Sequence, residues 1–253
     1  MQALAFRSYP VQPWRNGRGI LRSIAQGDGW QLRLADIEHT GPFSDYAGRL
    51  RLFAIVRGAV ILRMPSGPAI ACDPQSPIVT FDGGEPPDCE LTPGDRESPA
   101  RALNLIVEPR RVVARLDRHA IGGEPLVVTG EGGDVVAIHV QSGRVICHAG
   151  VVPSDGNAAA SLPANRHDTI VAPSASGMRL TANAPGPAVV LVARVTRRVD
   201  PRRNSGSESR PAADPFPCYF RLAPITALSS PGDSDAPSRP PPMGRRTAVS
   251  RAL

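Results

Sequence analysis

Arginine is the residue type that offers the most chemistry in this sequence, because all 29 basic residues are arginine. In the run 49–57 the side chains of a strand would alternate, which places Arg49, Arg51, Phe53 and Ile55 on one face. A guanidinium at the mouth of a β-barrel can hold a carboxylate through two parallel hydrogen bonds. We therefore expect Arg51 to anchor an anion; the alternative is that this end of the face is only solvated.

Two asparagines could form hydrogen bonds with the polar part of a small ligand. Asn104 lies inside the apolar stretch "ALNLIV", where an unpaired amide would cost roughly 1–3 kcal/mol. We therefore expect Asn104 to face a pocket. Asn16 precedes Gly17 in a typical turn pair, so a turn role and a pocket role both stay open.

The histidines do not form a recognisable metal site. The chain contains no His-x-His, although His139 and His148 flank a turn and could face each other across a two-stranded ladder. A third ligand is not visible in the sequence. We predict neither a bound metal nor a cofactor.

Catalytic patterns are equally weak. Ser44 precedes Asp45 without the G-x-S-x-G turn of a hydrolase nucleophile. His39, beside Glu38 and near Tyr46, offers the acid and base types of a metal-free isomerase or epimerase, which stays an alternative. We assign no catalytic residue and favour a protein that is not an enzyme.

The segment "PWRNGRG" (13–19) resembles a phosphate-binding loop only superficially, because such a loop lies between a strand and a helix. The stretches that follow, "ILRSIA" and "WQLRLADIE", alternate like strands. We predict a hairpin turn here.

The elements that position these residues are strands arranged in an internal repeat. Two stretches, 50–64 and 135–149, each read as a hairpin with its turn at Arg57-Gly58 or Ser142-Gly143. Each is followed by a strand with a turn (77–84, 168–177) and by a strand ending in an arginine pair (100–111, 188–198). The spacing of about 85 residues predicts a duplicated antiparallel barrel or jelly roll. The stretch 109–119 also favours strand over helix.

Composition limits the function classes. Residues 1–193 hold 18 Arg and 18 acidic residues, whereas residues 194–253 hold 11 Arg and 5 acidic residues. The net charge of +6 therefore belongs to the end of the chain, and we do not expect the core to bind nucleic acid. The Pro-, Ser- and Arg-rich stretch 197–253 is predicted to be disordered, with a weakly apolar island around "CYFRLAPI".

Location and cysteine chemistry follow from what the sequence lacks. No apolar run is long enough for a membrane helix and no secretory signal is visible, so we expect a cytoplasmic protein without a membrane partner. The four cysteines are widely spaced, which favours reduced structural thiols over a zinc site or a disulfide framework.

Taken together, the motifs resemble the HutD/Ves family of cupin-like proteins. The resemblance rests on "PWRNGRG", on Trp30 followed by "GPFS" (41–44), on the Arg51 strand, on "FDGG" (81–84) and on "LNLI" (103–106), and it covers residues 5–195. This chain departs from the family pattern at Arg15, Arg18, Gln31, Arg33 and Ala102. Because Gln31 and Arg33 are two residues apart, the basic group stays on the same strand face.

The resemblance implies an all-β bicupin: residues 1–112 and 113–196 form two cupin-like jelly-roll barrels, and residues 197–253 form a disordered tail. It also implies a modulator of histidine utilisation that senses a small acidic intermediate such as urocanate or formylglutamate. The other alternative is a scaffold or nucleic-acid-associated protein acting through the basic tail. The expected partner is a small carboxylate, held by Arg15, Asn16, Arg33, Phe43, Ser44, Arg51 and Asn104.

Overall fold

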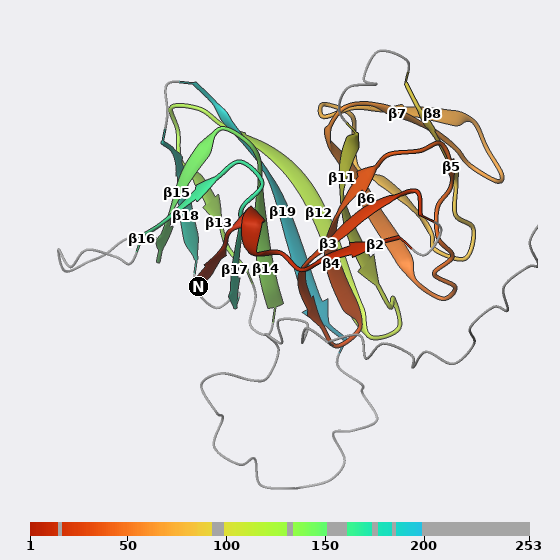
Figure 1. Ribbon diagram of the computed structural model, residues 1–253. Coiled ribbons are helices and arrows are strands. Elements are labelled where there is room, and N and C mark those ends of the chain that lie inside the picture. Colours follow the sequence, from red (N-terminus) through yellow and green to blue (C-terminus); the bar gives the residue numbers. More distant parts are fainter. Residues whose placement is uncertain are drawn as a thin grey trace, which may run out of the picture.

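The computed structural model describes residues 1–14, 17–92, 99–130, 134–150, 161–173, 177–183 and 186–198. In this part of the chain the only helical element is the short 3₁₀ turn η1 (Phe6–Ser8), and the rest of the regular structure is strand. The strands form two barrels that lie side by side (Figure 1). No helix in the described ranges is long and apolar enough to cross a membrane.

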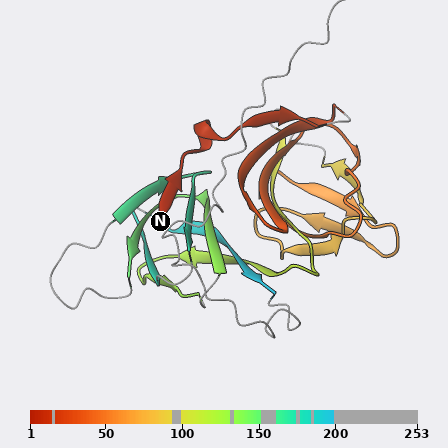
Figure 2. The same ribbon diagram turned by 90° about the horizontal axis from the view of Figure 1, so that it is seen from below.

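The first barrel consists of two facing antiparallel sheets. Its larger sheet has the order β2-β3-β4-β11-β6-β9, with bounds Val11–Pro13, Gly19–Gly27, Trp30–Ile37, Ala100–Val107, Leu50–Arg57 and Val79–Asp82. Its smaller sheet has the order β5-β10-β7-β8, with bounds Gly41–Pro42, Asp88–Leu91, Val60–Arg63 and Ala69–Cys72. Figure 2 looks into this barrel from below.

The second barrel repeats this plan. Its larger sheet has the order β1-β17-β14-β19-β12, with bounds Gln2–Leu4, Thr169–Pro173, Asp134–Ser142, Ala188–Arg197 and Val112–Ile121. Its smaller sheet has the order β13-β18-β15-β16, with bounds Leu126–Val128, Met178–Ala182, Arg144–Ala149 and Ser161–Asn165. The central order β9-β6-β11-β4 corresponds to β17-β14-β19-β12, so the predicted duplication and the strand at 109–119 are confirmed.

The two predicted hairpins are wrong. β6 and β7 lie in different sheets of the first barrel, and β14 and β15 lie in different sheets of the second. Gly58 and Gly143 have positive φ values of 70° and 75°, which turn the chain out of one sheet and into the facing one. Two runs of alternating apolar and polar residues around a glycine look the same whether the strands pair with each other or lie in facing sheets. The sequence pattern does not show which strand pairs with which.

The chain begins in the sheet of the second barrel. β1 pairs antiparallel with β17, and the backbone N–H of Phe6 donates to Asp168 Oδ1 at 2.8 Å. The first residues therefore depart from the division at residue 112, because the open edge of β17 is completed by the N-terminal strand. At the other end β19 runs to Arg197, so the boundary at 197 falls at the end of a strand, and residues 199–253 lie outside the described residues.

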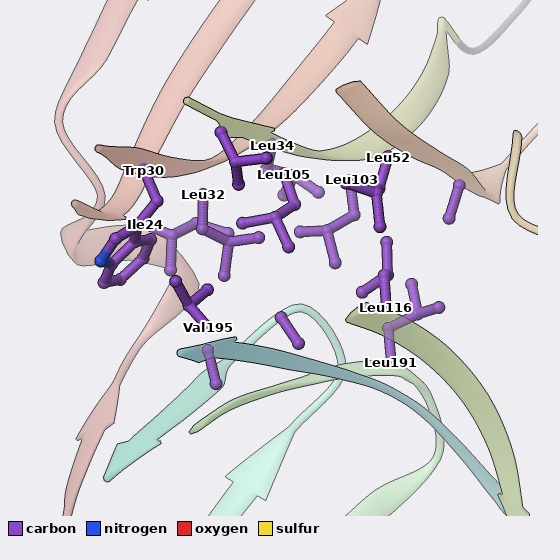
Figure 3. Packing of buried hydrophobic residues seen from close by; sticks show 14 of the residues in the cluster. Ile24, Trp30, Leu32, Leu34, Leu52, Leu103, Leu105, Leu116, Leu191 and Val195 are labelled. Atoms are coloured by element: carbon purple, nitrogen blue, oxygen red, sulfur yellow. The ribbon is translucent and has the colours of Figure 1, made fainter. Parts of the chain in front are cut away.

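The barrels pack against each other through the outer faces of their larger sheets. From the first barrel come large aliphatic side chains such as Leu32, Leu52 and Leu103, and from the second come Leu116 and Leu191 (Figure 3). Each barrel also has its own apolar interior. Burial of this apolar surface holds the two halves together.

Strand β6 shows how the alternation of side chains distributes residues between these cores. Leu52 and Ala54 join the core between the barrels, whereas Phe53 and Ile55 face the interior of the first barrel. The predicted alternation along 49–57 is therefore confirmed.

Candidate functional site

The interior of the first barrel opens into a cavity of about 480 Å³. Residues of β2, β3, β4, β6 and β11 line it, together with the loop 43–46. Five residues that the sequence nominated meet here: Arg33, Phe43, Ser44, Arg51 and Asn104. The other two, Arg15 and Asn16, lie outside the described residues.

Strand register explains why residues so far apart in sequence meet. Asn104 on β11 pairs with Arg33 on β4 and with Phe53 on β6. One step along the same face, Ile106 lies between Gln31 and Arg51. Since cross-strand neighbours on one face lie about 5 Å apart, the polar side chains form two adjacent rows on the cavity wall.

Arg51 is buried inside an aromatic box, with only 5% of its surface exposed. Its Cζ lies 5.1, 5.4 and 4.9 Å from the ring centres of Phe43, Tyr46 and Phe81. Nη1 donates a long hydrogen bond of 3.4 Å to the Ser44 carbonyl oxygen. The solvated alternative for this position is therefore wrong, because the β6 face turns inward rather than toward water.

No carboxylate among the described residues pairs with Arg51. Burial lowers the pKa of Arg51 to about 10, with a further contribution from the charge of Arg33. The guanidinium still carries its charge at neutral pH. A desolvated cation without a counter-ion is costly, and an anion entering the cavity would offset that cost.

Arg33 is the second cation in the cavity. Its Nη1 donates to the Tyr46 hydroxyl at 3.3 Å, and it forms no ion pair within the described ranges. Arg49, by contrast, is neutralised by Glu108 at 2.7 Å. The site therefore presents two guanidiniums without carboxylate partners.

Three buried polar atoms at the wall have no hydrogen-bond partner within the described ranges. They are Arg51 Nε, Asn104 Oδ1 and Gln31 Oε1. The first is a donor, and the other two are acceptors as their amides are placed. The cavity therefore suits a ligand that accepts hydrogen bonds from arginine and donates hydrogen bonds to the amide oxygens. The sequence analysis treated Gln31 only as a departure from the family pattern, although its spacing of two from Arg33 put it on the same face.

The segment 13–19 borders the cavity. Trp14 lines it and packs edge-to-face against Phe43, with ring centres 6.2 Å apart. The turn is closed by the Gly17 N–H donating to the Trp14 carbonyl at 3.0 Å, and Gly17 has φ of 67°. A Cβ on Gly19 would overlap the Asp36 carbonyl oxygen, so glycine is required there. The predicted turn between two strands is confirmed.

The residues considered for catalysis are not assembled. Glu38 and His39 are exposed and do not line the cavity, although Tyr46 does. His139 and His148 do not face each other across a ladder, because β14 and β15 belong to different sheets. The described residues contain no group of three or more His, Cys, Asp or Glu side chains that could hold a metal ion. Cys72, Cys89 and Cys147 are free and buried, and Cys218 lies outside the described part.

Comparison with known proteins establishes the family. Residues 7–190 match the family model HutD. The chain belongs to the HutD family. A relative from Pseudomonas putida, described as an uncharacterized 21.2 kDa protein in the hutC 3′ region, is 34% identical over 128 residues. That match spans 46% of this chain and 63% of the relative, less than two thirds of its length.

Two solved structures share the HutD-type architecture. A conserved protein of unknown function from Pseudomonas aeruginosa PAO1 superposes with a TM-score of 0.66 at 28% identity, over 78% of this chain and 99% of that one. HutD from Pseudomonas fluorescens SBW25 superposes with a TM-score of 0.62 at 22% identity, over the same shares of the two chains, and shows the fold alone. The predicted all-β bicupin fold and the family resemblance are confirmed.

Proposed function

We propose that this HutD family member is a small-molecule-binding protein that modulates histidine utilisation by sensing a small acidic intermediate in its first barrel. Family membership and the relative in a hutC 3′ region support the pathway. The intermediate is of the urocanate or formylglutamate type. The protein acts by binding and not by catalysis.

The observation that carries the proposal is the state of Arg51. It is a buried cation, stacked among aromatic rings, with no carboxylate partner among the described residues and an unpaired Nε. A carboxylate can accept two parallel hydrogen bonds from a guanidinium, while the rings of the box contact its carbon chain.

The remaining polar atoms narrow the ligand class. Asn104 Oδ1 and Gln31 Oε1 need a donor, and both candidate acids carry one: an imidazole N–H in urocanate and a formamide N–H in formylglutamate. Formylglutamate also has a second carboxylate, which matches the second cation, Arg33. The wall chemistry therefore favours an N-acylated dicarboxylate over a monocarboxylate.

Calorimetry with urocanate, formylglutamate and glutamate tests the site. A hydrogen bond to a charged group is worth roughly 1.5–3 kcal/mol and a neutral one about 1 kcal/mol. Arg51→Ala is therefore expected to weaken binding about 10- to 150-fold, and Asn104→Ala several-fold. Arg179→Ala, an exposed arginine on β18, serves as the matched control.

The outcomes separate two failures. If the wild-type protein binds none of the three acids at millimolar concentration, the sensor function is wrong. If an acid binds but Arg51→Ala, shown to be folded by circular dichroism, binds it equally well, the ligand occupies another site. Arg33→Gln is expected to weaken formylglutamate more than urocanate, because only the former offers a second carboxylate.

A further inference from the structure

A second cavity lies where the two barrels meet. This junction cleft has a volume of about 820 Å³, within the range of ligand-binding pockets. Both hinge turns of the repeat border it, through Arg57-Gly58 from the first barrel and Ser142 from the second. The loop 74–78 and part of β12 complete its walls.

Cations dominate the charge of the junction cleft. Arg57, Arg118 and Arg166 line it, and among the residues that the structure describes the one acidic side chain in its wall is Asp117. Asp117 is already engaged by Arg115 at 2.8 Å and by Arg194 at 3.3 Å. Its negative charge therefore pairs with Arg115 and Arg194 and not with the three cleft arginines.

The three arginines differ in how much of their hydrogen-bonding capacity is used. Arg118 donates to Gln141 Oε1 at 3.0 Å, to the Ile55 carbonyl at 3.0 Å and to the Ser76 carbonyl, so it fastens the two barrels together. Arg57 donates Nε and Nη2 to the Pro99 carbonyl and lies 4.0 Å from Asp36. Arg166 is exposed and has no hydrogen bond or ion pair with the described residues.

The carboxylate near Arg57 does not balance the local charge. Asp36 is held by Arg22 and by Arg101, the latter through Nε at 2.5 Å and Nη2 at 3.1 Å. Burial is the main cause that lowers the pKa of Arg57, and the charges of Arg101 and Arg166 lower it further while Asp36 raises it. Like charges that face one cavity repel each other, and an anion between them relieves that repulsion.

Apolar side chains form the other part of the wall. Val56 and Ile78 come from the first barrel, and Leu116 and Val189 come from the second. Val56 and Leu116 are already buried, so the apolar surface open to a ligand is that of Ile78 and Val189, and a ligand that carried only charge would leave it exposed to water. A ligand with an apolar group next to its charge would bury it.

We propose that the junction cleft is a second ligand site, which binds an organic anion carrying an apolar group, with the anionic head between Arg57 and Arg166. Arg51 and Arg57 are six residues apart on the same strand, about 20 Å along the backbone, and the two cavities share no lining residue among those described. The proposal stands independently of the ligand in that cavity.

Phenyl phosphate is a suitable probe, because it joins a dianionic head to an apolar ring. Titration calorimetry with the full chain at low salt is expected to show one bound phenyl phosphate. Arg166→Gln is expected to weaken binding about 5- to 20-fold. This loss is smaller than that expected from breaking a fully buried ion pair, because the Arg166 side chain is exposed. Arg57→Gln is expected to weaken it at least as much. Arg166 has no hydrogen bond or ion pair to lose within the described part of the chain, so this variant remains informative if Arg57→Gln fails to fold.

Controls and competitors decide the outcome. Arg179→Gln is expected to bind phenyl phosphate as the wild type does, and inorganic phosphate is expected to bind at least tenfold more weakly. The proposal is overturned by absence of binding at 5 mM probe, by unchanged affinity in Arg166→Gln, or by loss of binding in Arg51→Met, which would place the probe in the first barrel. Equal affinity for inorganic phosphate would overturn the apolar part of the assignment.

Discussion

The two barrels share one strand order but place opposite chemistry at corresponding positions. With the hinge Arg57-Gly58 aligned to Ser142-Gly143, Arg51 corresponds to Val136 and Phe53 to Ile138. Val136 and Ile138 are fully buried in the aliphatic interior of the second barrel. Where the first barrel keeps a charged side chain beside a cavity, the second packs a valine into its core.

The strand next to them repeats the contrast. Asn104 pairs with Phe53, and its counterpart Val192 pairs with Ile138. Arg33 corresponds to Asp117, which neutralises Arg194 at 3.3 Å. Among the described residues, one half of the duplication thus carries two arginines without carboxylate partners beside a cavity, and the other half has an acidic residue paired with arginine and a filled core.

The largest effect is expected from placing an arginine in the second barrel at the position that corresponds to Arg51. Val136→Arg puts a guanidinium into a core without a counter-ion or a cavity, so the free energy of unfolding should fall by more than about 4 kcal/mol. Urea denaturation measures this, with Val136→Met as the control for size. A loss below about 2 kcal/mol would mean that the second barrel can open a cavity like the first.

The second effect concerns the outer faces of the corresponding strands β6 and β14. Ala54 on β6 has its counterpart in His139 on β14, which is completely buried. Burial lowers the pKa of His139 to about 3, helped by His167 and Arg101, and burial lowers the pKa of His167 to about 4. His139 Nδ1 lies 2.9 Å from Thr169 Oγ1, which also accepts a hydrogen bond from the Tyr9 hydroxyl at 2.8 Å.

These histidines make folding sensitive to acid. Because their folded pKa values lie below the unfolded value near 6.5, the unfolded chain takes up protons first as the pH falls. Stability is therefore full above about pH 7 and decreases between pH 6.5 and 3, by about 4 kcal/mol between pH 7 and 5. Urea titrations at both pH values should show this loss reduced by about half in His139→Gln. The exposed control His39→Gln should keep the full loss, and an equal loss in both variants would contradict the assignment.

A smaller effect of opposite sign is expected in the first barrel without ligand. Arg51→Met removes an unpaired buried cation while keeping an unbranched side chain against the rings of the box. We expect the free energy of unfolding to rise by about 1 kcal/mol, since desolvation outweighs the contacts with the rings. Urea denaturation of the ligand-free wild type and variant decides whether the desolvation cost of the guanidinium or its contacts with the rings is larger. A decrease would show that the guanidinium–ring contacts dominate.

The smallest effect is expected from removing the chain beyond the barrels. Truncation after Arg198 keeps both barrels whole, so the melting temperature should stay within a few degrees of the full chain. Loss of cooperative unfolding would show that the island around "CYFRLAPI" belongs to the core. If only the full chain binds DNA with a steep salt dependence, the alternative role of the basic tail gains support.

Much of the fold followed from local patterns. The strands, the repeat and the face that Arg51 shares with Phe53 follow from period-two alternation and from glycine turns, which act over a few residues. The hairpins were predicted wrongly because pairing between strands depends on contacts distant in sequence. Gly58 allows a tight turn, but the hydrophobic faces decide that β7 joins the opposite sheet.

The site divides in the same way. The sequence alone determined which side chains share a strand face, and together with the family resemblance it nominated Arg33, Arg51 and Asn104. Only the tertiary structure decided that Arg51 has no counter-ion among the described residues and that Arg57 and Arg166 meet at the junction cleft. Charge balance and desolvation depend on every group that surrounds a side chain in space, and those neighbours come from strands that the chain brings together only when it folds.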